Sequence, residues 1–327
     1  MTDVPSAATA TRAGVRLPIA PARIGLVLAI VGLCLVAGWL SPGFLTPNNL
    51  LNVVRQASVV GVAAIGLTFV VLVRGVDVSV AGVITVVATI ATGVMNGSDA
   101  NIPLAVAVAI VLGLAIGTFN GLLASRGVHP FILTLGVGVA LLGLTQLFTG
   151  GTSLGNPAPS FRSVLNARIG PVPVLAIVFF VLAGIAALVH GRTTFGRRIV
   201  LVGANPLSAR LSGVSVNRYV ILAYATSGLT AALAGLVLLA RSGPPSNFTG
   251  MGLEFQALAA VILGGTSFAG GKGGVWGSVA GALAMALALN LVNILGLPFS
   301  AQQIVQGAVI ILIAAAYAAV RKESAGD

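Results

Sequence analysis

Residues 102–124, IPLAVAVAIVLGLAIGTFNGLLA, form an uninterrupted stretch without a charged side chain. A helix of this length matches the hydrocarbon core of a bilayer, which is about 30 Å thick. Glycines recur in it at every fourth position, at Gly113, Gly117 and Gly121. This spacing puts them on one helix face and lets a neighbouring helix approach closely. We therefore predict a membrane-spanning helix that packs inside a bundle.

Comparable apolar runs recur along the chain, so we expect an all-α, polytopic transmembrane bundle. Ten of them lie at 24–40, 53–73, 79–95, 102–124, 131–149, 172–190, 218–240, 255–268, 274–296 and 301–320. The eighth run is short and ends in glycine pairs, which allows either a partial or a full crossing. We expect about ten crossings, within a range of eight to ten.

The composition excludes several classes of protein. Of the 327 residues, 57% are hydrophobic and 7% are charged, whereas soluble domains carry roughly 25% charged residues. Lipid must therefore be the solvent for much of the chain. The net charge of +11 does not predict a nucleic-acid partner, because no dense basic stripe with interleaved aromatics is present. The single cysteine, Cys34, excludes an intramolecular disulfide.

Charge placement predicts the orientation, because basic residues concentrate in cytoplasmic loops. With both termini inside, 13 of the 17 basic residues fall in cytoplasmic segments: Arg12, Arg16, Arg23, Arg74, Arg126, Arg192, Arg197, Arg198, Arg210, Arg218, Lys272, Arg321 and Lys322. We expect a disordered cytoplasmic tail at 1–20, a transmembrane domain at 21–321 and a short cytoplasmic tail at 322–327. An uncleaved first helix is favoured over a cleaved signal peptide, since no clear cleavage site follows the first run.

The longest predicted cytoplasmic loop, 191–217, contains local signals for a short helix. Asn205 is a good N-cap, Pro206 suits the first helical position, and Gly213 suits the residue beyond the last turn. We predict a helix over Pro206–Ser212. So short a helix needs a surface to dock on. Composition alone leaves open whether this surface is the membrane or a partner protein.

Three stretches carry a family resemblance: GANPLSARLSGVSVNR at 203–218, RGVDVSVAG at 74–82 and EFQALAAVILGGTSFAGGKGG at 254–274. From about Leu40 to Val320, the chain resembles the permease subunits of ribose-type ABC sugar importers. The resemblance implies that the loop docks a coupling helix on an ATPase subunit, through Gly203, Asn205, Pro206, Arg210, Leu211, Ser212 and Gly213. It also marks helix junctions at Gly75, Asp77, Ser79, Glu254, Gly264, Gly265, Gly270, Gly271, Lys272 and Gly273. The chain departs from the family pattern at Ala81, Ala204 and Gln256.

The resemblance implies a bacterial inner-membrane importer of a pentose, hexose or related polyol. Its expected partners are a second permease copy, most simply in a homodimer, a cytoplasmic ATPase, an extracytoplasmic sugar-binding protein and membrane lipid. We expect no enzyme activity and no cofactor in this chain, with ATP and magnesium held by the ATPase. The glycine-rich stretch before Lys272 is not a P-loop, because Thr266 stands where the first glycine is required and Gly273 follows the lysine.

Uncharged polar residues inside the helices are candidates for lining a pathway. They are Gln56, Asn120, Asn290, Asn293, Gln302 and Gln306. Such groups suit a polyhydroxylated solute, but hydrogen bonding between helices is the favoured interpretation for any one of them.

Arg74 and Asp77 stand three residues apart at a predicted helix junction. We expect either a local ion pair or a helix-start contact there. A proton relay in an ion-coupled secondary transporter is the alternative. The positions of Asp77 and Glu254 near helix ends argue against it.

Overall fold

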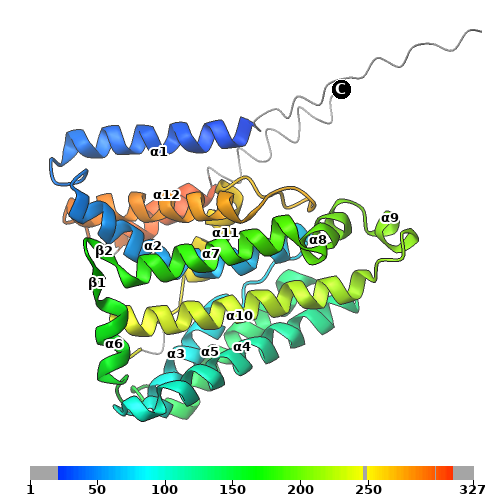
Figure 1. The fold of residues 1–327 in the computed structure, drawn as a ribbon, viewed down its shortest axis with the longest axis horizontal. Helices are drawn as coiled ribbons and strands as arrows, with labels where there is room; N and C mark the ends of the chain where they lie inside the picture. The colour runs from blue at the N-terminus through cyan, green and yellow to red at the C-terminus, as the bar shows by residue number, and fades with distance from the viewer. Residues whose placement is uncertain (1–20, 246–248, 299, 312–327) are drawn as a thin grey trace, which may run out of the picture.

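The computed structural model describes residues 21–245, 249–298 and 300–311, most of which are α-helical (Figure 1). The long helices are α1 (Pro21–Leu40), α2 (Pro47–Leu72), α3 (Val80–Met95), α4 (Ile102–Ser125), α5 (Pro130–Thr149), α7 (Val174–Arg192), α10 (Val216–Ser242) and α12 (Val275–Ile294). Shorter elements are η1 (Asp99–Asn101), α6 (Pro159–Asn166), the strands β1 (Arg168–Ile169) and β2 (Val172–Pro173), α8 (Thr194–Ala204), α9 (Pro206–Leu211) and α11 (Leu253–Leu263). Residues 300–311 are also helical.

Each predicted apolar run corresponds to a helix over the residues that the structure describes, so the all-α prediction is confirmed; residues 312–320 of the tenth run lie outside them. Six described helices are long and apolar enough to cross a membrane: α2, α4 with η1, α5, α7, α10 and α12. The described part of α1, and α3 and α11, are shorter apolar helices. The count of about ten crossings therefore stays a prediction. The predicted tails at 1–20 and 322–327 lie outside the described residues.

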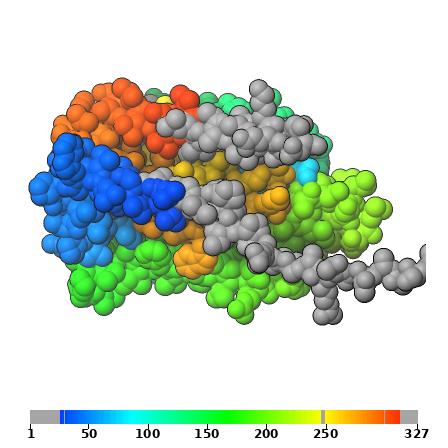
Figure 2. All heavy atoms as spheres, turned by 90° about the horizontal axis from the view of Figure 1, so that it is seen from above, coloured from blue at the N-terminus to red at the C-terminus, as the bar shows by residue number. Residues whose placement is uncertain are grey.

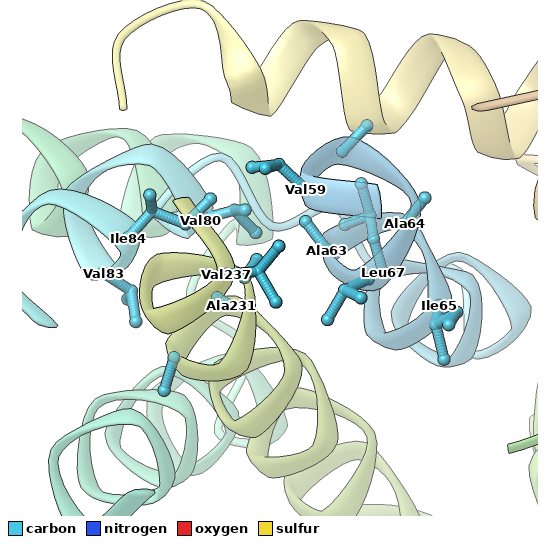
Figure 3. Close-up of a cluster of buried hydrophobic side chains, with 14 of the residues drawn as sticks. Val59, Ala63, Ala64, Ile65, Leu67, Val80, Val83, Ile84, Ala231 and Val237 are labelled. Carbon is cyan, nitrogen blue, oxygen red and sulfur yellow. The ribbon is translucent and has the colours of Figure 1, made fainter. Parts of the chain in front are cut away.

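The core of the bundle forms where α2, α3 and α10 meet. In the most apolar window of each helix, 83% of α2 and 67% of α10 are buried. Figure 3 shows Val237 of α10 between Ala63 and Leu67 of α2 and Ile84 of α3. By contrast, only 22% of α4, 17% of α5 and 22% of α7 are buried in the corresponding windows. These three helices leave most of their surface to lipid or to another chain.

Small residues set the closest helix contacts, as the glycine spacing predicts. A Cβ added at Gly113 would lie 2.4 Å from the carbonyl oxygen of Gly228 on α10. At Gly117 it would lie 2.3 Å from the carbonyl oxygen of Tyr224. Gly281 of α12 approaches Ala260 of α11 in the same way, at 2.0 Å. Side chains at these positions would force the helices apart.

The two ends of the bundle differ. Helices α8 and α9 lie at one end in Figure 1, whereas α6 and the antiparallel β1–β2 pair lie at the other. Figure 2 shows the α8–α9 segment, in green, projecting beyond the bundle. The α8–α9 end carries Arg74, Arg126, Arg192, Arg197, Arg198, Arg210, Arg218 and Lys272. The local signals in the 191–217 loop predict one short helix, and α8 is a second helix that they do not predict.

Candidate functional site

Helix α9 begins and ends at the residues that carry the local signals. The Asn205 side-chain oxygen accepts hydrogen bonds from the backbone N–H groups of Leu207 and Ser208, at 3.0 and 3.1 Å. After the last turn, Gly213 adopts φ +75° and its N–H donates to the carbonyl of Arg210 at 2.9 Å. The predicted helix is confirmed to within one residue, since α9 spans Pro206–Leu211.

Helix α9 presents an apolar surface outward. Leu207 is 65% exposed and Leu211 is 82% exposed, whereas Ala209 is fully buried against the rest of the protein. Large exposed leucines at a projecting end that is otherwise rich in arginine are unfavourable in water unless something covers them. The geometry of α9 therefore suits a docking element.

Behind α9, three distant segments meet in what we call the junction: residues 72–75, 203–204 and 270–273. The Gly271 N–H donates to the carbonyl of Leu72 at 2.9 Å. A Cβ at Gly203 would lie 1.7 Å from that same carbonyl oxygen and 2.6 Å from the Gly271 nitrogen. Gly270 and Gly271 both have positive φ, +79° and +70°, which other residues adopt only with strain. Backbone therefore packs directly on backbone here.

The Arg74 side chain reaches across the junction. Its Nε donates to the carbonyl of Gly203 at 2.6 Å, and its terminal nitrogen donates to that of Ala204 at 2.7 Å. The expected ion pair with Asp77 does not form, because Arg74 extends to the end of α8 instead. The alternative of a helix-start contact is confirmed, since Asp77 accepts from the N–H of Ser79 at 3.0 Å.

Asp77 is the centre of a buried polar network. Its carboxylate also accepts from the hydroxyls of Ser79 and Ser227, at 2.6 and 2.7 Å, and the latter residue lies on α10. Asn120 of α4 donates to the Ser79 hydroxyl at 2.8 Å. Thr134 of α5 accepts from the N–H of Val78 at 3.0 Å. The loop between α2 and α3 is thus bonded to three membrane helices.

A separate cavity of about 320 Å³ lies between α2, α10, α11, α12 and the helix at 300–311. Its polar lining includes Gln56, Arg241, Gln256, Asn293 and Gln302, together with Ser242 and Thr249. Apolar residues such as Val59, Leu238 and Met285 line the rest. Its size lies at the small end of ligand pockets, and its mixed lining is typical of them.

The structure divides the predicted pathway residues into two groups. Gln56, Asn293 and Gln302 line the cavity, and the Gln302 amide donates to Asn293 at 2.6 Å. Gln306 lies beside the cavity and accepts from Gln256 at 3.0 Å. In contrast, Asn290 of α12 exchanges hydrogen bonds with Asn49 of α2, at 2.9 and 3.2 Å. Asn120 bonds Ser79. These two asparagines therefore hold helices together, as the favoured interpretation expects.

The chain is similar to known proteins along most of its length. A family model described as a branched-chain amino acid transport system / permease component matches residues 49–314. The ribose import permease protein RbsC of Escherichia coli (strain K12) is 38% identical over 296 residues, which cover 88% of this chain and 90% of that protein. The chain belongs to this permease family.

Other members are similarly close along their length. The D-allose transport system permease protein AlsC of Escherichia coli (strain K12) is 34% identical, with 87% of each chain covered. The xylose transport system permease protein XylH of that strain is 31% identical, covering 88% of this chain and 89% of the relative. No solved structure matches the chain. The chain is thus a multi-pass membrane permease, and its relatives are transport subunits rather than enzymes.

Most family-motif residues of this permease lie at or near the junction end. Gly75 approaches the Tyr224 hydroxyl, and Gly264 packs on Gly277. Gly265 and Gly273 have positive φ, and the Lys272 carbonyl accepts from the N–H of Ser267 at 2.9 Å. Glu254 is the exception, because it lies in the first turn of α11, at the end of that helix remote from the junction.

Four polar residues that line the cavity are not among the predicted pathway residues: Arg241, Ser242, Thr249 and Gln256. Arg241 and Gln256 both line the cavity, and Arg241 also donates to the carbonyl of Gln56 at 3.2 Å. In the sequence, Arg241 and Glu254 bracket an outer segment, which leaves open either a contact with a binding protein or two solvated charges. The position of Arg241 is the signal that could have indicated its role. It lies in the last turn of α10, close to Gln56 of α2, so that both can face the cavity.

Proposed function

We propose that the chain is the membrane subunit of an ATP-driven importer for a monosaccharide or related polyol. The observation that carries this proposal is the match to permeases named for ribose, D-allose and xylose transport along about nine-tenths of their length. In this proposal the chain crosses the bacterial inner membrane about ten times with both termini in the cytoplasm. The clustering of basic residues at the α8–α9 end supports this orientation.

The proposed assembly has four parts. Two permease copies form the pathway, which is consistent with the sparse burial of α4, α5 and α7. A separate ATPase, holding ATP and magnesium, docks on α9 through Leu207 and Leu211. An extracytoplasmic binding protein delivers the sugar at the opposite end, near α6 and the β1–β2 pair.

The cavity supports a polar, uncharged cargo. Its lining offers several amides and one guanidinium as hydrogen-bond donors, and no carboxylate is among the lining residues that the structure describes. Sugar hydroxyls both donate and accept, so amides can hold them in several orientations. Hydrogen bonds between neutral groups are individually weak, which suits a pathway that must release its cargo.

The proposed mechanism is alternating access driven from α9. Nucleotide-dependent closure of the ATPase dimer displaces α9, and the displacement shifts the bundle between outward-open and inward-open arrangements. Because α9 is only six residues long and is bonded at both ends, it moves as a rigid piece with the junction behind it.

Reconstitution of the chain with its ATPase and binding protein tests this function. Uptake of labelled ribose, allose and xylose into proteoliposomes is expected to require ATP. Leu211→Ala and Arg210→Ala should abolish uptake while ATP hydrolysis and membrane insertion persist. Leu35→Ala, which truncates a leucine that is 68% exposed on α1, is the matched control and should transport normally. Uptake by the chain alone under a proton or sodium gradient would instead establish the ion-coupled alternative.

A further inference from the structure

The backbone of Arg74 has an unusual conformation. Among the described residues, only Arg74 and Asn96 adopt positive φ without being glycine, and Arg74 does so at +67°. Asparagine tolerates this region comparatively well, whereas an arginine there is strained by its Cβ. A strained residue persists only where its surroundings hold it, and such residues concentrate at functional positions. The conformation at Arg74 therefore requires an explanation beyond that of an ordinary turn.

The contacts of the side chain supply this explanation. The left-handed backbone turns the guanidinium toward the carboxyl end of α8, where it bonds the carbonyls of Gly203 and Ala204 at 2.6 and 2.7 Å. The last carbonyls of a helix have no partner within the helix, and they favour a positive charge. Arg74 thus caps α8 one residue before Asn205, the N-cap of α9. An arginine that merely fixed the topology would need neither bond.

The other end of the same segment is anchored inside the membrane bundle. Three residues after Arg74, the Asp77 carboxylate accepts a hydrogen bond from the Ser227 hydroxyl of α10. The carbonyl of Val76 accepts from the Tyr224 hydroxyl, also on α10, at 3.1 Å. Two further hydrogen bonds connect the segment to α4 and α5. Asn120 of α4 donates to the Ser79 hydroxyl, and Thr134 of α5 accepts from the N–H of Val78. Six consecutive residues therefore connect the coupling end of the molecule to three membrane helices.

We propose that residues 74–79 form a transmission strap, in which Arg74 is the positioning residue that fastens α8 and α9 to the bundle. This inference rests on the proposed function, because it assigns the route by which movement of α9 reaches α4, α5 and α10. The alternative is that the glycine contacts of the junction suffice. In that case the arginine contributes nothing to coupling.

Three variants of the full-length chain separate these possibilities. Arg74→Gly removes both bonds but relieves the backbone strain, since glycine adopts φ +67° freely. Arg74→Lys keeps the charge with a single donor group. Arg126→Gly is the matched control, because Arg126 is exposed after α4 and no side-chain hydrogen bond of it is found among the described residues.

The first measurement is hydrogen exchange of residues 203–213 in lipid nanodiscs, without any partner. Arg74→Gly should accelerate exchange roughly fivefold to a hundredfold, the range expected for losing two hydrogen bonds. Arg74→Lys should fall between Arg74→Gly and the wild type, and Arg126→Gly should match the wild type. Unchanged exchange in Arg74→Gly would overturn the inference.

The second measurement is the number of ATP molecules hydrolysed per sugar transported by the reconstituted importer. Arg74→Gly should raise this ratio, with Arg74→Lys intermediate and Arg126→Gly unchanged. Faster exchange with an unchanged ratio would also overturn the inference, because the strap would then be structural only. If the wild-type complex shows no ATP-driven uptake at all, the proposed function fails. If the wild-type complex transports but Arg74→Gly leaves the ratio unchanged, only the inference about Arg74 fails.

Discussion

The junction is formed by backbone contacts, whereas the cavity is lined by side chains. At the junction, backbone meets backbone through glycines, and a Cβ at Gly203 would lie 1.7 Å from the Leu72 oxygen. The cavity is instead lined by side chains, mainly amides and aliphatic groups. Backbone contacts have few alternative arrangements and can transmit a displacement, whereas side chains can change rotamer as a solute passes. In the proposed mechanism, the junction therefore suits transmission of movement and the cavity suits binding of the cargo.

The largest effect is expected from Gly203→Ala at the junction. The added Cβ would meet two backbone atoms that cannot move independently, the oxygen of Leu72 and the nitrogen of Gly271. Overpacking of this kind destabilises a fold by about 3 kcal/mol. We expect a clearly lower melting temperature in detergent and loss of uptake.

Gly191→Ala is the control for this prediction, because a Cβ at Gly191 would meet nothing within 4 Å. It should melt and transport like the wild type. Equal melting temperatures for the two variants would contradict the picture of a tightly packed junction, since the clash at Gly203 would then be relieved without cost.

An intermediate effect is expected in the cavity. Gln302→Leu and Asn293→Leu each remove an amide from the lining while roughly preserving volume. Loss of one hydrogen bond to an uncharged sugar should reduce uptake about fivefold, with the melting temperature nearly unchanged. Initial uptake rates at several sugar concentrations measure this effect.

Gln146→Leu is the matched control for the cavity variants, since Gln146 is an exposed amide on α5 and does not line the cavity. Reduced uptake in this control as well would indicate a general effect of added hydrophobicity. The amides of the cavity would then have no specific effect on uptake.

The smallest effect is expected at the start of α9. Asn205→Ala removes the acceptor for the N–H groups of Leu207 and Ser208, which destabilises the helix by about 1 kcal/mol. Exchange of these two amides should accelerate about fivefold, and uptake should decline only modestly. Asn205→Asp keeps an acceptor oxygen and should retain wild-type exchange. Equally fast exchange in both variants would show that the cap contributes nothing.

Local and long-range features differ in how well the sequence predicted them. The ends of α9 were predicted to within one residue because Asn205, Pro206 and Gly213 act on their immediate neighbours. The sequence did not predict which polar side chains face the cavity and which bond a neighbouring helix. Asn290 and Asn293 are three residues apart on α12, yet the first bonds Asn49 and the second lines the cavity. Which neighbour each amide meets depends on helices far away in the chain.

The length of the spans shows a similar division. Apolar composition located all ten helical segments, since burial in lipid demands long runs without charge. It also indicated the short helices α3 and α11, but it did not reveal that α8 precedes α9. The end of α8 depends instead on the junction, where its last residues meet the turns at 73–79 and 264–274.

The sequence by itself thus determined the solvent, the helical class and the ends of α9, because hydropathy and capping act within a few residues. The tertiary structure decided the partner of Arg74, the network around Asp77 and the lining of the cavity. Each of these depends on atoms brought together from segments more than a hundred residues apart, such as the 129 residues between Arg74 and Gly203. No local signal in the sequence predicts such long-range contacts.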